Sequence, residues 1–161
     1  QLVSLRKKYS TYRSFAGQTI EEILSENQLK SSKKLKVNTL KSGYLRNDSG
    51  SYTFVPFNRD FQVAPIMTFC KFDFDNDGAD EILAAGNYFG VQPFHGRLDS
   101  FTGALIKDEK TIITGDKLGL DFAQKSIRHL NTILFQNKNY LIATPNNGKV
   151  QLYQIGKSIK N

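Results

Sequence analysis

Residues 65–85 read PIMTFCKFDFDNDGADEILAA, which is an apolar run, an acidic run and a second apolar run. In the acidic run Asp73, Asp75 and Asp77 alternate with other residues, a glycine follows, and Glu81 stands at the ninth position. An EF-hand would place its last ligand at the twelfth position and a helix on each side. Both flanks here are instead short apolar runs of the kind that forms strands. The stretch therefore predicts two strands joined by an acidic loop.

The acidic loop, residues 73–81, carries the ligands that Ca²⁺ prefers. This hard cation takes six to eight oxygens at about 2.3–2.6 Å, and Gly78 permits the sharp turn that would wrap them around one point. Asp80 is expected to point away from the metal as a surface charge. The alternative is a polar hairpin whose acids are merely solvated. The expected calcium ligands are the side chains of Asp73, Asp75, Asp77 and Glu81 and the backbone carbonyl of Ala79.

The composition is that of a folded domain. The chain has 161 residues, of which 39% are hydrophobic and 12% aromatic, so it can build a core. No apolar run approaches the roughly 18 residues that a membrane-spanning helix needs. The single cysteine, Cys70, cannot form an internal disulfide and is expected to be a buried thiol. With neither an initiator Met nor a signal peptide, we expect a processed protein or an excised piece, with a signal peptide on its precursor.

The net charge of +7 is concentrated in residues 1–46. This part holds ten Lys and Arg against three Glu, whereas the rest holds twelve of each sign. A solvated basic face is one interpretation, and attraction of an anionic partner is the other. No recognition helix or aromatic-interleaved basic motif accompanies the charge, so nucleic acid is not an expected partner.

The secondary-structure pattern changes near Lys33. Residues 2–14 have helical spacing, and the capping box at Thr19 predicts a second helix through about Leu29. We therefore expect a basic helical segment at 1–33 and strands at 34–161. The expected strands are 34–46, 52–57, 65–72, 82–85, 104–107, 111–114, 126–135, 140–144 and 150–155. Turn signals at Asn47–Gly50 and Asn147-Gly148 separate neighbouring strands.

Short antiparallel strands at even spacing are typical of sandwiches, barrels and propeller blades. Residues 65–114 have the strand number and length of one four-stranded propeller blade. Residues 35–57 then correspond to the outer two strands of a preceding blade, and 126–155 to three strands of a following one. The predicted fold class is mostly β, with one complete and two partial antiparallel β-propeller blades, a propeller fragment, after a short helical segment.

The acidic loop and its continuation, residues 73–87, resemble the FG-GAP/VCBS repeat family, as does the hairpin at 47–54. The chain looks like the C-terminal part of large secreted VCBS-repeat proteins of Bacteroidetes type. The resemblance implies a seven- or eight-bladed propeller with a calcium loop between the first two strands of a blade. It also implies an extracellular scaffold that recognises a glycan or a protein.

Three departures from the family pattern matter. Glu81 stands where Asp is more usual, and residues 47–52 lack a second acidic triplet, so one metal site is expected. One complete and two partial blades cannot close a ring, because propellers typically need four to eight blades. Either the chain is a piece of a larger propeller, or its open edges pair with another chain.

The sequence favours a calcium-stabilised, non-catalytic binding or scaffold module that is secreted or at the cell surface. A loop with only oxygen ligands binds Ca²⁺ weakly, so it is occupied where the calcium concentration is near millimolar, as it is outside cells. The ligand surface is expected at residues 87–99, because loops often carry function. The alternative is that the aromatic residues of this segment fill the interface between blades and that Arg97 forms an ion pair with Asp99. The candidate ligand-binding residues are Tyr88, Phe89, Gln92, Phe94, His95, Arg97 and Asp99.

An enzyme and an assembly piece remain alternative functions. The chain could belong to a carbohydrate-processing or other secreted enzyme, or it could dock on a larger protein through its open β edges. No spacing joins the candidate acid–base groups into a triad or a transition-metal site. Those groups are His95, His129, Asp99, Asp116 and Asp121.

Overall fold

The computed structural model describes residues 3–108 and 111–156. Its contacts divide the chain into two compact units, residues 1–40 and residues 41–161, called unit 1 and unit 2 below. The sequence predicted this boundary near Lys33. No helix in the described part of the chain is long and apolar enough to cross a membrane.

The described residues of unit 1 form four short helices instead of the two that were predicted. Ser and Thr side chains cause the extra breaks, because α2, α3 and α4 each begin with a capping box, at Thr11, Thr19 and Ser25. Residues 33–42 form neither helix nor strand, so the strand predicted from residue 34 is wrong for its first part. The helices are α1 (Val3–Lys8), α2 (Tyr12–Phe15), α3 (Ile20–Ile23) and α4 (Glu26–Ser31).

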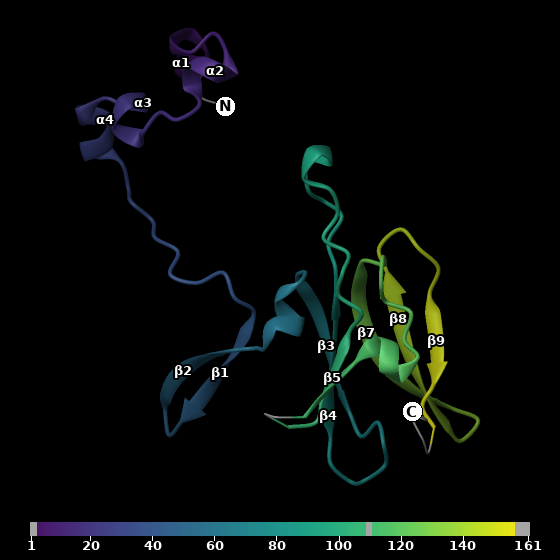
Figure 1. The fold of residues 1–161 in the computed structure, drawn as a ribbon. Helices are drawn as coiled ribbons and strands as arrows, with labels where there is room; N and C mark the ends of the chain where they lie inside the picture. The colour runs from purple at the N-terminus through teal and green to yellow at the C-terminus, as the bar shows by residue number, and fades with distance from the viewer. Residues whose placement is uncertain (1–2, 109–110, 157–161) are drawn as a thin grey trace. The chain divides into compact units, whose positions relative to one another are not determined.

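Unit 2 consists of three antiparallel sheets joined by short connections (Figure 1). Sheet 1 pairs β1 (Gly43–Asp48) with β2 (Ser51–Pro56). Sheet 2 has the order β3-β4-β5-β6, and sheet 3 the order β7-β8-β9. The strands of sheets 2 and 3 are β3 (Ile66–Phe72), β4 (Glu81–Gly86), β5 (Ala104–Ile106), β6 (Ile112–Thr114), β7 (Ile127–Phe135), β8 (Lys138–Pro145) and β9 (Gln151–Gln154). The mostly-β prediction is therefore confirmed, whereas the described residues form no closed propeller and the assignment to blades stays a prediction.

Sheet 2 is buried on both faces near its centre because its strands alternate. Leu83 and Ala85 of β4 face sheet 3, where they join Phe122, Ile127 and other apolar residues in the larger core cluster. The intervening residue Ala84 packs in a second cluster on the opposite face. Strand β7 of sheet 3 lies beside β3 and β4. The acidic loop therefore begins and ends on strands that are held from both sides.

Aromatic rings connect sheet 1 to the second face of sheet 2. Phe57 lies between Tyr44 and Phe61, at centroid distances of 5.8 and 4.7 Å. Phe61 is fully buried and also contacts Phe101. Phe61 belongs to one of three short 3₁₀ helices that the sequence did not predict. They are η1 (Arg59–Gln62), η2 (Pro93–His95) and η3 (Gly115–Leu118).

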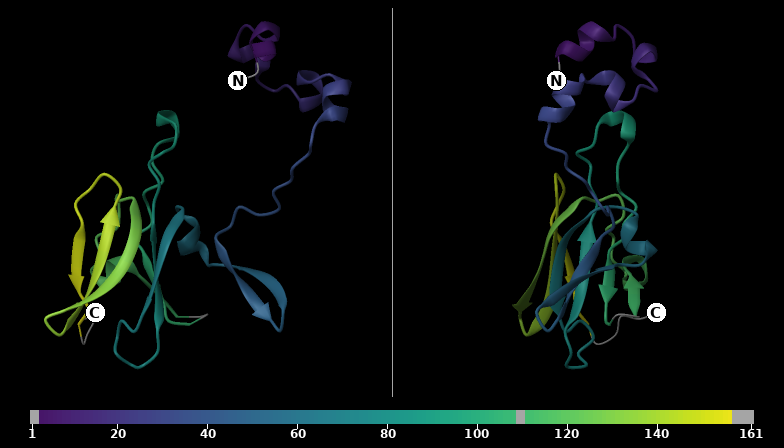
Figure 2. Two further views of the ribbon diagram at one scale, coloured as in Figure 1. Left: turned by 180° about the vertical axis from the view of Figure 1, so that it is seen from behind. Right: turned by 90° about the vertical axis from the view of Figure 1, so that its left-hand side faces the viewer.

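Residues 87–99 form an arm that extends away from the sheets, with η2 near its tip (Figure 1). Tyr88 and Leu98 exchange two backbone hydrogen bonds of 2.8 and 3.0 Å, which hold the two sides of the arm together. The arm and the β8–β9 loop lie at one end of unit 2, and the acidic loop lies at the other (Figure 2).

Candidate metal centre

The acidic loop between β3 and β4 is folded by its own carboxylates. Asp73 accepts hydrogen bonds from the backbone N–H of Asp77 at 3.1 Å and of Gly78 at 3.0 Å. The Asp77 carboxylate in turn accepts from the N–H of Ala79 at 2.9 Å. Gly78 has φ 92°, a left-handed angle that favours glycine. Alternating aspartates followed by glycine thus produce a turn whose carboxylates face one another.

Four carboxylates converge in this loop. Asp73, Asp75, Asp77 and Glu81 each offer one oxygen, and these oxygens lie within 4.8 Å of one another. Two oxygens that each bind one Ca²⁺ at about 2.3–2.6 Å are at most about 5 Å apart. The grouping is therefore compatible with a single hard cation. Among the described residues, no other group of His, Cys, Asp and Glu meets the same condition.

Glu81 is the most deeply placed member of the cluster. It opens β4, is only 2% exposed, and accepts a 2.8 Å hydrogen bond from the backbone N–H of Phe74. The longer Glu side chain thus reaches back from the strand into the loop. Asp80 behaves as predicted, because it pairs with Lys71 at 2.9 Å outside the cluster. The N–H of Ala79 bonds to Asp77, and the role of its carbonyl as a fifth ligand stays a prediction.

A lysine from another hairpin neutralises part of this charge. Lys107 follows β5 and forms an ion pair with Asp75, and its Nζ lies 4.0 Å from Asp77. The hydrogen bond to Lys107 lowers the pKa of Asp75, and the same bond raises the pKa of Lys107 together with the charges of Asp75, Asp77 and Glu81. The four carboxylates therefore stabilise a positively charged group placed beside them, here the Lys107 ammonium. Nothing in the sequence pointed to Lys107. It lies beside the carboxylates because Ile82 of β4 pairs with Ile106 of β5, and Lys107 follows Ile106.

The residues predicted to bind a glycan or protein ligand all lie on the arm, and their surroundings differ. Phe94 is 80% exposed and contacts His95, beside Gln92 at the start of η2. The guanidinium of Arg97 lies 4.8 Å from the ring centroid of Phe89. The Arg128 guanidinium lies 5.4 Å from the ring of Tyr88.

The alternative interpretation of the arm is wrong in part. Phe94 packs in no interface within the described residues, since most of its side chain is exposed, and its packing against a further blade stays untested. Among the described residues, no ion pair joins Arg97 to Asp99. Asp99 instead accepts a backbone hydrogen bond of 3.1 Å from Gln124 through its carbonyl. The arm therefore presents side chains to solvent while its base is tied to the body of unit 2.

Asn87 anchors the base of the arm, and it was not singled out in the sequence. Its side chain is fully buried and donates to the carbonyls of Phe101, Phe122 and Lys125 at 2.9–3.1 Å. Its Oδ1 accepts from the N–H of Phe101 at 2.9 Å. The backbone has φ 78°, which Asn tolerates better than most residues. One side chain thus joins the arm to two other segments of unit 2.

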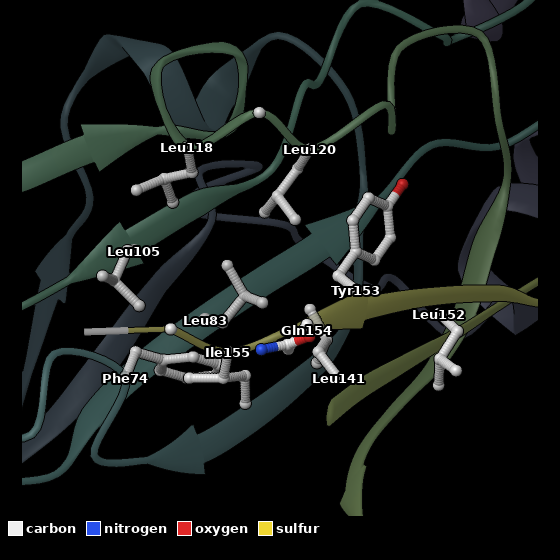
Figure 3. A pocket seen from close by; sticks show the side chains of 12 residues that line it. Phe74, Leu83, Leu105, Leu118, Leu120, Leu141, Leu152, Tyr153, Gln154 and Ile155 are labelled. Carbon is white, nitrogen blue, oxygen red and sulfur yellow. The ribbon is translucent and has the colours of Figure 1, made fainter. Parts of the chain in front are cut away.

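An apolar pocket of about 500 Å³ lies between sheets 2 and 3. Leu83, Leu105 and Leu118 line one part of it, and Leu141 and Tyr153 line another (Figure 3). The Tyr153 hydroxyl accepts a 3.2 Å hydrogen bond from the backbone N–H of Asp121. Because its walls are mainly leucines, the pocket lacks convergent groups for acid–base chemistry.

The predicted acid–base candidates are not brought together. Asp121 pairs with Lys125, and the side-chain hydrogen bond with Thr114 lowers the pKa of Asp116. His129 lies on β7. Within the described ranges, no hydrogen bond or ion pair joins two members of the set. The set comprises His95, His129, Asp99, Asp116 and Asp121.

A comparison of the chain with protein-family models, with curated proteins and with solved structures found no match in any of the three. The metal centre therefore has to be judged on its own geometry.

Proposed function

We propose that the chain is a calcium-stabilised, non-catalytic binding or scaffold module of a secreted or cell-surface protein. The observation that carries this proposal is the convergence of four carboxylates to within 4.8 Å in the loop between β3 and β4. A bound Ca²⁺ offsets their mutual repulsion and holds the β3–β4 hairpin closed. Extracellular calcium modules typically bind at about 10⁻⁴–10⁻³ M, which matches the calcium concentration outside cells.

The three sheets are interpreted as consecutive blades of a larger propeller. The four strands of sheet 2 follow one another in sequence order, and the first strand of sheet 3 lies beside the first strands of sheet 2. The resemblance of residues 73–87 to FG-GAP/VCBS repeats supports the same interpretation. Since sheet 1 has two strands and sheet 3 has three, ring closure needs further strands from the remainder of the propeller.

Exposed apolar residues favour a second candidate function, that of an assembly piece. Phe69 and Ile82 on sheet 2 are exposed, as are Leu45 and Phe54 on sheet 1. These two sheets also border an apolar pocket that includes Tyr44, Phe57 and Phe69. Apolar side chains gathered in this way are typical of surfaces that another element covers. Docking on a larger protein is compatible with the calcium site.

A calcium titration tests the proposed function. We expect calorimetry to show one Ca²⁺ bound per chain, with a Kd of about 10⁻⁴–10⁻³ M. At about 10 mM calcium this affinity stabilises the folded state by about 1.4–2.7 kcal/mol, because the ion binds only the folded loop. The melting temperature should then rise by about 4–10 °C relative to a sample in chelator. Absence of both the binding heat and the shift would contradict the proposal.

Replacing Lys107 with alanine is expected to tighten calcium binding. The Lys107 ammonium pairs with Asp75 and must give up that contact when a divalent cation enters. A single ion pair near the surface contributes little to stability, so the Kd should fall by only about two- to fivefold in the same calorimetric titration. Lys71→Ala is the matched control, because Lys71 pairs with Asp80 outside the cluster. Equal affinities of the two variants would show that Lys107 does not compete with the metal.

A further inference from the structure

Strand β9 is the last strand of sheet 3, and one of its two edges has no partner strand in the described structure. In an antiparallel pair, every second residue directs its backbone N–H and C=O groups to the neighbouring strand, and the residues between direct theirs outward. The N–H of Ile155 donates to the Asn139 carbonyl at 2.8 Å, which places Tyr153 among the residues that bond to β8. The backbone groups of Leu152 and Gln154 therefore point away from β8, toward the open edge.

The other edge strands of sheets 2 and 3 have features that discourage pairing with a further strand, whereas β9 has none of them. Strand β3 shifts register between Ile66 and Thr68, β7 shifts register between Ile127 and His129, and β6 has only 3 residues. Irregular pairing, short strands, charged residues and prolines all protect open edges in natural proteins. Strand β9 pairs with β8 without a register shift, and its sequence, QLYQ, has no charge and no proline. Its edge is therefore available for pairing.

Sheet 3 ends one strand before the sheet that faces it. Strand β7 lies beside β3 and β4, and at the other side of sheet 3 the Tyr153 hydroxyl accepts from the N–H of Asp121, just beyond η3. The two sheets therefore follow the same order across the core, with three strands of one facing four of the other. A fourth strand beside β9 would lie opposite the part of sheet 2 that includes β6 and η3.

The apolar pocket of about 500 Å³ lies at this position (Figure 3). Its walls include Leu105 and Leu118 on the side of sheet 2, and Tyr153 and Ile155 on the side of β9. The pocket continues the core between the two sheets, because Leu105 belongs to the larger core cluster and the other three residues pack against that cluster. Among the described residues that line the pocket, none is charged. The position beside β9 therefore favours an uncharged apolar side chain.

We propose that the open edge of β9 binds an extended strand of a partner protein, with uncharged apolar residues at the positions that face the pocket. The backbone of this strand bonds to the N–H and C=O groups of Leu152 and Gln154. Residues directly opposite each other in neighbouring strands point to the same face of a sheet, so the partner residue opposite Tyr153 enters the pocket. In this mode of recognition the backbone provides affinity and alternate side chains provide specificity. The inference deepens the proposed binding function, on which it rests, by naming the edge and the chemistry of its protein ligand.

Fluorescence anisotropy with the full chain in about 1 mM calcium tests the inference. The probe is the labelled peptide KTVTVTVTK, in which apolar and polar residues alternate. We expect a Kd below about 1 mM, and absence of binding at that concentration would overturn the proposal. The peptide KTVTPTVTK, whose central proline interrupts the strand, should bind at least about tenfold more weakly.

Leu152→Pro and Leu152→Thr form a matched pair, because both remove the leucine side chain and only proline removes the N–H. That N–H points to the open edge, so its loss leaves the hydrogen bonds between β8 and β9 intact, and proline is tolerated at such positions. We expect Leu152→Pro to weaken peptide binding by about tenfold or more. Leu152→Thr should change it by about twofold or less. Equal affinities of the two variants would overturn the proposal.

Amide hydrogen exchange of the unmodified chain examines the same edge without any substitution. The amides of Leu152 and Gln154 should exchange rapidly in the free chain and at least about tenfold more slowly with saturating peptide. The amide of Tyr153, which bonds to β8, should be protected in both samples. Protection at another place in the chain, with no change at Leu152 and Gln154, would mean that the peptide binds elsewhere and would overturn the proposal.

Two further measurements separate this inference from its alternatives. Self-association of the free chain in analytical ultracentrifugation, if Leu152→Pro abolishes it, would assign the edge to a second copy and overturn the proposal of a different partner. Melting curves with calcium and with chelator, recorded on the same samples, test the proposed function separately. An intact calcium shift without peptide binding rejects the strand site alone, and peptide binding without a calcium shift rejects the metal alone.

Discussion

Replacing Asn87 with alanine is expected to lower the free energy of unfolding by about 3–5 kcal/mol. The two N–H groups of the side-chain amide are shared among the carbonyls of Phe101, Phe122 and Lys125, and its oxygen accepts from the N–H of Phe101. Each buried polar group left without a partner costs about 1–3 kcal/mol, and water that enters the vacated space recovers part of this cost. Urea denaturation followed by circular dichroism measures the effect.

Asn137→Ala is the control for this experiment. Asn137 also has a left-handed backbone, with φ 60°, but it lies exposed in the β7–β8 turn. Its replacement therefore carries only the conformational cost, about 1 kcal/mol. If both variants lose the same stability, the buried hydrogen bonds of Asn87 contribute nothing beyond its backbone angle.

The strands of sheets 2 and 3 were predictable because local patterns determine them. The strand expected at 65–72 is observed as β3 at Ile66–Phe72, and the one expected at 126–135 is observed as β7 at Ile127–Phe135. Each has apolar residues at the positions that face a core, and each is bounded by a turn. The hairpin turn expected at Asn47–Gly50 also joins β1 to β2.

The N-terminal third was predicted less well, and the reason is physical. Leu35 and Val37 alternate with lysines, which is the pattern of a half-buried strand, yet both side chains are exposed. In the described structure no strand pairs with residues 33–42. An alternating pattern forms a strand only when neighbouring elements pair with it and cover one face, so this segment stays irregular. In residues 11–31, Thr11, Thr19 and Ser25 each cap the start of a new short helix, so the helical pattern is divided into separate turns.

The carboxylate cluster was predictable because its residues are close in sequence, whereas the contacts of Lys107 and Asn87 depend on the tertiary fold. Asp73, Asp75 and Asp77 lie within one loop, so their spacing alone brings their oxygens together. Lys107 reaches the cluster through the β4–β5 register, and Asn87 meets Lys125 across a long sequence separation. Neither contact has a local signal.

Replacing Asp75 with alanine is expected to abolish the stabilisation by calcium. Asp75 supplies one of four converging oxygens, and the three remaining carboxylates leave too few ligands for a cation that takes six to eight. The melting temperature of the variant in calcium should therefore equal that of the variant in chelator. The shift of about 4–10 °C expected for the unmodified chain would be lost.

The variant also loses the ion pair with Lys107, so its melting temperature in chelator falls slightly, because a single ion pair near the surface contributes little to stability. Asp80→Ala is the matched control, since it removes a carboxylate from the same loop that pairs with Lys71 outside the cluster. This control should keep the full calcium shift. Equal shifts for the two variants would mean that calcium acts through the general negative charge of the loop and not through a defined coordination sphere. Retention of the shift in Asp80→Ala and its loss in Asp75→Ala would locate the ion at the cluster, because both variants remove one carboxylate from the same loop.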